Sequence, residues 1–196
     1  MNPDEGRVEL CFFGGAQVVT GANFLLRDSR PATTAKKSRT QIMLDCGLFQ
    51  GSRVVDKRNY DPFPYQPADV DAVFISHAHL DHIGRLPRLV REGFSGPVYS
   101  TLPTKEIAQL SLLDSLGVME KESRHSKTPL LYSEADVTRL FTHWQTLEYH
   151  ETITIGHWQI RLLNAGHILG SAMPELTDQL SQKKIVFTGD LGNSPA

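Results

Sequence analysis

The sequence has few cysteines, no long apolar run and no excess of charge of either sign. Its two cysteines, Cys11 and Cys46, lie in or beside apolar stretches. This placement favours buried thiols in a reducing compartment over a disulfide. No apolar stretch approaches the roughly 20 residues that cross a bilayer, and the polar residues 1–6 carry no secretory signal. We therefore expect a cytoplasmic protein without a membrane partner.

The net charge of −2 excludes the overall basic field that marks many nucleic-acid-binding proteins. A nucleic-acid partner would then need a local basic patch or the positive charge of another domain. Residues 28–40 are polar and basic without an apolar anchor, which is typical of a mobile hairpin tip rather than of a phosphate site. A chain of 196 residues that is 40% hydrophobic is long enough for one substantial core.

What the sequence does contain is a dense group of metal-ligating side chains, in the run SHAHLDH at residues 76–82. The run follows the apolar residues 72–75, which predict a buried strand, and precedes the helical periodicity of residues 83–92. Imidazole nitrogens together with a carboxylate form a typical zinc ligand set. Histidines that only filled a core would each need hydrogen-bond partners there. We interpret the run as a metal site on a strand-to-helix turn, in preference to a polar turn that happens to be rich in histidine.

The remaining pattern predicts strands, then a mixed region, then strands again. Strands are expected at 8–13, 23–27, 41–44, 97–100, 151–155, 158–163, 171–176 and 184–188, with helices at 105–116 and from Ser133 to about 144, and a charged linker at 120–129. The first strands are separated by glycines, which suits antiparallel neighbours. This order indicates an α/β fold in which sheet layers are flanked by helices.

Three further residues with ligating side chains end predicted strands and have glycine nearby. They are Asp45, His167 and Asp190. Glycine beside a ligand lets the backbone come close to a metal or adopt a positive φ. Because strand ends on one edge of a sheet converge, we expect these residues to meet the histidine-rich turn.

Counting ligands predicts two ions. The three nitrogens of His77, His79 and His167 would complete a catalytic zinc site with an open position for water, and Asp81, His82 and Asp190 would form a second, more oxygen-rich set. Two metals roughly 3.5–4 Å apart can stabilise both the attacking and the leaving oxygen of a hydrolysis, and zinc lowers the pKa of bound water to about 7. These residues predict metal-dependent hydrolysis without defining its substrate.

The other histidines and one cysteine are placed outside the site. We interpret four histidines as surface or structural residues, namely His125, His143, His150 and His157. The side chain of Cys46 should point to the opposite face of its strand from that of Asp45.

These segments together resemble the metallo-β-lactamase fold, and within it the β-CASP branch of RNA-processing nucleases. The resemblance to that branch depends on three sequence motifs, DCGLFQG at 45–51, AGHILGSA at 165–172 and TGDLG at 188–192. It covers residues 8–192 and implies an αββα sandwich. In that family a β-CASP domain follows the motif matched by Asp190, and the chain then returns to complete the fold. Residues 1–196 are therefore expected to be the N-terminal part of a metallo-β-lactamase domain, incomplete at the C-terminus through truncation or a split gene.

The resemblance also implies roles for individual residues. His77, His79 and His167 would hold the first zinc, and Asp81 and His82 the second, with Asp190 bridging the two ions. The implied catalytic residues are Asp81, which would take a proton from the attacking water, His82, and Asp45, which would orient the ligands. The family's last zinc-binding histidine and its proposed acid belong to the parts that follow. The second zinc is therefore expected to be weak in this chain.

The leading prediction is a zinc-dependent nuclease in which a metal-held hydroxide cleaves single-stranded RNA to a 3′-hydroxyl and a 5′-phosphate. A second reading keeps the metals but changes the substrate to a small ester, thioester or lactam. A third is a zinc-stabilised fragment that is inactive until it pairs with its missing C-terminal half or a partner chain. The sequence leaves open whether cleavage is endo- or exonucleolytic, which RNA or DNA is cut, and the oligomeric state.

Overall fold

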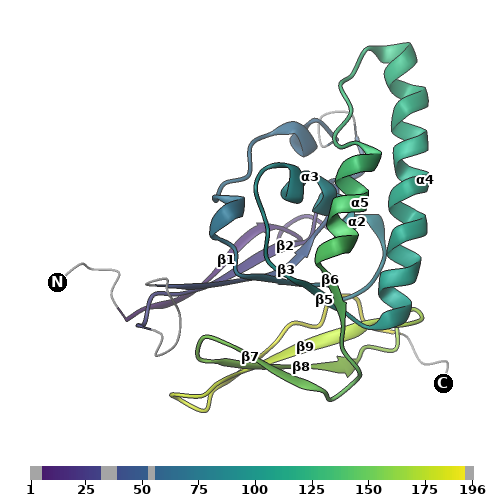
Figure 1. Ribbon diagram of the computed structural model, residues 1–196. Helices are drawn as coiled ribbons and strands as arrows, with labels where there is room; N and C mark the ends of the chain where they lie inside the picture. Colours follow the sequence, from purple (N-terminus) through teal and green to yellow (C-terminus); the bar gives the residue numbers. More distant parts are fainter. Residues whose placement is uncertain (1–5, 32–38, 53–55, 193–196) are drawn as a thin grey trace.

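The structure, a computed structural model that describes residues 6–31, 39–52 and 56–192, has two β-sheets packed face to face (Figure 1). The first sheet contains six strands in the order β1-β2-β3-β4-β5-β6, and the second contains four in the order β10-β9-β8-β7. The strands of the first sheet are β1 Val8–Gly14, β2 Asn23–Asp28, β3 Thr40–Cys46, β4 Ala72–Phe74, β5 Val98–Ser100 and β6 Trp144–Thr146. Those of the second are β7 Thr152–Ile155, β8 Trp158–Asn164, β9 Ala172–Asp178 and β10 Lys184–Val186.

The first sheet changes from antiparallel to parallel pairing at β3. Strands β1, β2 and β3 are antiparallel, as the glycine-separated pattern predicted, whereas β3, β4, β5 and β6 are parallel. A parallel strand covered on both faces is apolar along its whole length, and every residue of β4 is buried. Because parallel strands end at the same edge, the residues that follow β3 and β4 are brought together there.

Helices cover the outer face of the first sheet (Figure 1). They are α2 Leu80–Ile83, α3 Leu86–Arg91, α4 Leu102–Ser126 and α5 Glu134–His143, with short 3-10 turns at Arg58–Tyr60 and Pro67–Asp69. The predicted start of α5 is confirmed, since the hydroxyl of Ser133 accepts a hydrogen bond from the backbone N–H of Asp136 in a capping box. The described helices include none that is both long and apolar enough to cross a membrane.

Two predictions about the helices are wrong in detail. The charged stretch 120–129 was expected to be a linker, but α4 continues to Ser126 and stops only where Lys127 adopts a left-handed conformation. Its sequence EKESRH contains good helix formers with charges four residues apart, so the helix extends without apolar anchors. The helix predicted over 83–92 is divided into α2 and α3, because Pro87 lies in the first turn of α3, where proline is tolerated only at a helix start.

The core consists of two apolar layers on either side of the first sheet. One lies beneath the helices and includes Met43, Val73 and Leu89, and the other lies between the sheets and includes Phe74 of β4 and Ile160 of β8. In the described part of the chain no helix covers the outer face of the second sheet. Three layers of the predicted αββα sandwich are thus present, and the predicted fold class is confirmed.

A buried ion cluster joins the two sheets at the end of β2 opposite Asn23. Arg30 donates hydrogen bonds to Asp28 of β2 at 2.6 Å and to Asp178 of β9 at 2.9 Å, and both carboxylates are almost fully buried. The hydrogen bonds of Arg30 hold the pKa of Asp178 well below its usual range. Burial by itself raises the pKa of Asp28, but the hydrogen bonds and charge of Arg30 outweigh that effect and lower it.

We expect Arg30→Ala to lower the free energy of unfolding by about 3 kcal/mol at pH 7, because two buried carboxylates then lose their cation. Because the pKa values of these two carboxyl groups are lower in the folded than in the unfolded protein, the ion cluster stabilises the fold at a pH above the unfolded values near 4. This stabilisation is lost as the pH falls through the folded pKa values. Urea unfolding at pH 7 and pH 3 should therefore show a smaller gap between variant and wild type at pH 3. Arg161→Ala, which removes a partly exposed pair with Glu175, is the control and should cost under about 1 kcal/mol. A gap that is equal at both pH values would contradict the prediction.

Candidate metal centre

The predicted site residues converge at one edge of the sandwich, because four strand ends meet there. Leu44 of β3 pairs with Phe74 of β4, so Asp45 and the turn that begins at Ser76 leave the sheet side by side. The second sheet contributes His167 after β8 and Asp190 after β10. Glycine is needed at position 189 for the segment that carries Asp190 to lie against Ser76. The φ of Gly189 is +51°, and a Cβ there would lie 2.7 Å from the Cβ of Ser76.

Four of the predicted ligands form one compact group, in which the candidate ligand atoms of His77, His79, His167 and Asp190 all lie within 4.8 Å of one another. The Nδ1 of His79 is 2.9 Å from the Nε2 of His77 and 3.3 Å from the Nε2 of His167. The Oδ2 of Asp190 is 3.8 Å from His77 and 3.6 Å from His167. Tetrahedral zinc with bonds of roughly 2.0–2.1 Å separates its ligand atoms by about 3.3–3.4 Å. The chemistry and spacing of this group therefore fit such an ion.

A second group shares Asp190 with the first. The Nε2 of His82 lies 3.5 Å from the Oδ1 of Asp190 and 3.8 Å from the Oδ2 of Asp81. The two oxygens of Asp190 thus face different groups, Oδ1 toward His82 and Oδ2 toward His77 and His167. This is the arrangement needed for a carboxylate that bridges two ions.

Asp45 lies behind the ligands and is hydrogen-bonded to His82 directly and to His77 through Ser76. Its fully buried carboxylate accepts hydrogen bonds from the backbone N–H of Ser76 at 2.8 Å, the Ser76 hydroxyl at 2.7 Å and the Nδ1 of His82 at 2.7 Å. A His82 that donates from Nδ1 leaves its Nε2 lone pair free toward Asp81 and Asp190. The Ser76 oxygen is also 3.0 Å from the Nδ1 of His77. A hydrogen bond donated by this Nδ1 to Ser76 leaves the Nε2 lone pair of His77 free. Ser76 was not among the predicted site residues, although it is the first residue of the histidine-rich run.

The two innermost histidines have opposite pKa shifts. Burial lowers the pKa of His77 to about 2, with smaller contributions from the positive charges of His82, His79 and His167. His77 is therefore neutral at physiological pH, as a metal ligand must be. Burial also lowers the pKa of His82, but the charge and hydrogen bond of Asp45 outweigh it, and the net pKa is raised.

Three of the residues that were placed outside the site, His125, His157 and Cys46, have contacts elsewhere. The Nδ1 of His125 is 2.8 Å from a carbonyl oxygen of its own helix, and the Nε2 of His157 is 2.9 Å from the carbonyl oxygen of Pro31. Cys46 packs in the layer beneath the helices, and burial raises the pKa of its thiol to about 11. Both cysteines are free, with Cys46 buried and Cys11 half-buried.

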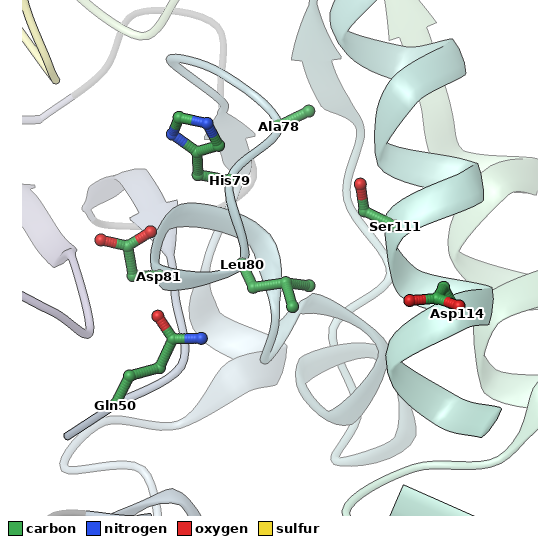
Figure 2. Close-up of a pocket in the computed structure, with 7 residues that line it drawn as sticks. All are labelled: Gln50, Ala78, His79, Leu80, Asp81, Ser111 and Asp114. Atoms are coloured by element: carbon green, nitrogen blue, oxygen red, sulfur yellow. The ribbon is translucent and has the colours of Figure 1, made fainter. Parts of the chain in front are cut away.

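A groove of about 330 Å³ opens beside the metal centre (Figure 2). His79 and Asp81 lie on one side of the turn, and Ser111 and Asp114 of α4 lie across from it, with Gln50 near Asp81. Among the described residues that line the groove there is no lysine or arginine. A negatively charged substrate that enters here would meet no lysine or arginine among the lining residues.

Comparison with known proteins places the chain in a family. Residues 36–194 match the metallo-beta-lactamase superfamily domain. The chain belongs to the metallo-beta-lactamase superfamily. The superfamily resemblance predicted from the motifs is thus confirmed.

Two curated relatives of this metallo-beta-lactamase chain are a ribonuclease and a transcription termination factor. Ribonuclease TTHA0252 of Thermus thermophilus is 40% identical over 182 residues, which cover 92% of this chain and 37% of the ribonuclease. Transcription termination factor FttA of Methanothermobacter thermautotrophicus is 38% identical over 156 residues, which cover 77% of this chain and 24% of the factor. The chain thus spans about a quarter to somewhat over a third of the length of these relatives.

A solved structure agrees on the fold. A metallo-beta-lactamase with an HARLDQ motif from Cronobacter sakazakii superposes with a TM-score of 0.50 at 17% identity, covering 87% of this chain and 53% of that one. At this identity the similarity concerns the fold alone.

Proposed function

We propose that this chain is the metal-binding hydrolytic part of an RNA-processing nuclease of the β-CASP branch, acting in the cytoplasm. The proposal of metal-dependent hydrolysis rests on one observation. Three separate segments bring together one group of candidate ligands: His77, His79, His167 and Asp190. The choice of RNA is supported by the 40% identity to a ribonuclease over nearly the whole chain. The β-CASP domain that the resemblance places after Asp190 stays a prediction.

We assign zinc to both ion positions because the first group is rich in imidazole nitrogen and the second combines an imidazole with carboxylates, which are typical zinc ligands. His77, His79 and His167 would hold the first ion, and Asp81 and His82 the second, with Asp190 between them. The second ion is expected to bind more weakly. It has fewer protein ligands, and its two carboxylates are partly exposed, at 21% for Asp81 and 48% for Asp190.

The residues have distinct tasks in the proposed hydrolysis. The ions, when bound, lower the pKa of water and stabilise the charge that develops on the phosphodiester. Asp81, partly exposed beside the groove, accepts a proton from the attacking water. His82 is held by Asp45 with its Nε2 directed toward the reacting groups. The water oxygen forms the new bond to phosphorus, the bond from phosphorus to the 3′ oxygen breaks, and the leaving oxygen takes up a proton.

A small neutral ester, thioester or lactam is the second candidate substrate. The lining of the groove favours it, because the lining residues include no lysine or arginine to pair with RNA phosphates. The chain covers only 37% of the ribonuclease and 24% of the termination factor. A third candidate is therefore a chain that binds zinc but needs a partner chain for activity.

Zinc counting and a substrate comparison test these readings. We expect native mass spectrometry to find one tightly and one weakly bound zinc, and labelled single-stranded RNA to be cleaved slowly but faster than generic ester or lactam substrates. A chelator should abolish cleavage and added zinc should restore it. A chain that binds no zinc would refute the proposal, and faster turnover of an ester or lactam would support the second candidate. Zinc binding without turnover of any substrate would support the third.

A further inference from the structure

Arg85, at the start of α3, is a buried cation directly behind the metal centre. It is only 4% exposed. Its guanidinium carbon lies 4.7 Å from the ring centroid of Phe49 and 5.2 Å from that of Phe63. Its Nε donates a hydrogen bond to the carbonyl oxygen of Gly47 at 2.8 Å, and its backbone N–H donates to that of Cys46 at 2.9 Å. Arg85 therefore holds two successive carbonyl groups of the loop that follows Asp45.

That loop is packed backbone to backbone against the turn that carries the second ligand group. A Cβ on Gly47 would lie 1.5 Å from the carbonyl oxygen of Asp81, so only glycine fits there. The backbone N–H of Leu48 donates to the carbonyl oxygen of Leu80 at 2.9 Å. Asp45 itself has a φ of +58°, a conformation that is uncommon for a residue with a side chain. A shift of this loop would therefore move Asp45 and the ligand turn together.

Ion pairing does not account for the burial of Arg85. The described residues include no carboxylate that forms a salt bridge with it, in contrast to Arg30, which pairs with two. A buried cation without a carboxylate is costly to maintain. Arginine offers what lysine lacks, namely a planar group that stacks on aromatic rings while it donates hydrogen bonds in fixed directions. Both of these features are used here, on Phe49, Phe63 and Gly47.

We propose that Arg85 is a positioning residue for the metal centre, which sets the loop carrying Asp45 and thereby the orientation of His82. The chain of contacts is short: the Arg85 guanidinium holds the Gly47 carbonyl, the loop places the Asp45 carboxylate, and that carboxylate holds the Nδ1 of His82. The inference rests on the metal binding in the proposed function, but not on RNA as the substrate.

The proposal is tested by measuring the zinc affinity of variants of this chain. The affinity is obtained by competition with a chelating dye, and the bound ions are counted by native mass spectrometry. We expect Arg85→Gln and Arg85→Lys each to weaken zinc binding by about ten- to a hundredfold, most strongly at the weaker site. Arg85→Lys should not retain wild-type zinc affinity, because an ammonium group keeps the charge but loses the stacking on the rings and the fixed direction of the hydrogen bond. Arg30→Gln is the matched control: it removes a half-buried, ion-paired arginine far from the metal centre, so it should lower the urea midpoint and leave zinc affinity unchanged.

Three results would overturn the proposal. They are wild-type zinc affinity in Arg85→Lys, wild-type affinity in Arg85→Gln, and an equal loss of affinity in Arg30→Gln, which would reduce the effect to general destabilisation. If the Arg85 variants do not fold, Phe63→Leu removes one of the two stacked rings while keeping the guanidinium. It should weaken zinc binding in the same direction, and unchanged affinity there would also overturn the proposal. A wild-type chain that binds no zinc would instead refute the proposed function and this inference together.

Discussion

Replacing His79 with alanine is expected to remove the tightly bound zinc and to abolish hydrolysis by this chain. The Nδ1 of His79 lies between the nitrogens of His77 and His167, at 2.9 and 3.3 Å, so it closes the nitrogen ligand set. An ion supplies several kcal/mol of transition-state stabilisation, and each 1.36 kcal/mol is a factor of ten in rate. Turnover should therefore fall by about a thousandfold or more.

The measurement pairs native mass spectrometry with cleavage of the best substrate found for the wild type. His125→Ala is the matched control, because it removes an exposed histidine of α4 that contacts only a carbonyl oxygen of its own helix among the bonds described. The control should keep both zinc and activity. Full turnover by His79→Ala would mean that the activity comes from another site or from a contaminating hydrolase.

The second large effect is expected for Asp45→Ala, which should destabilise the fold as well as the metal centre. The substitution leaves the Ser76 N–H, the Ser76 hydroxyl and the His82 Nδ1 without their buried acceptor. Unsatisfied buried groups cost about 1–3 kcal/mol each, so the free energy of unfolding should fall by about 4 kcal/mol. Zinc binding should weaken too, because His82 is no longer held in one tautomer.

Urea unfolding and zinc competition measure the two effects of Asp45→Ala separately. Asp45→Asn keeps the shape and one acceptor oxygen, so we expect a smaller loss of stability together with weakened zinc binding. Asp114→Ala removes an exposed acid of α4 and should change stability by under about 0.5 kcal/mol. An Asp45→Ala variant with the wild-type urea midpoint would contradict the role that we give to this buried carboxylate.

Local sequence signals were most reliable where a residue's environment is decided by its neighbours in the chain. The strand before the histidine-rich run, the capping box at Ser133 and the antiparallel pairing of β1, β2 and β3 follow from alternation, caps and glycines. The stretch 120–129 was misread because high charge is compatible with both a linker and an exposed helix. In the structure α4 runs through it to Ser126, as its helix-forming residues allow.

The sequence by itself determined which side chains can act on a metal: the run at 76–82, with Asp45, His167 and Asp190 at strand ends, names every member of the two ligand groups. Only the tertiary structure decided how they meet. The two oxygens of Asp190 face different groups, Ser76 is hydrogen-bonded to His77, and Arg85 holds the carbonyl of Gly47 in the loop after Asp45. These relations join segments of two sheets and a loop. They depend on how the sandwich packs, which no local spacing encodes.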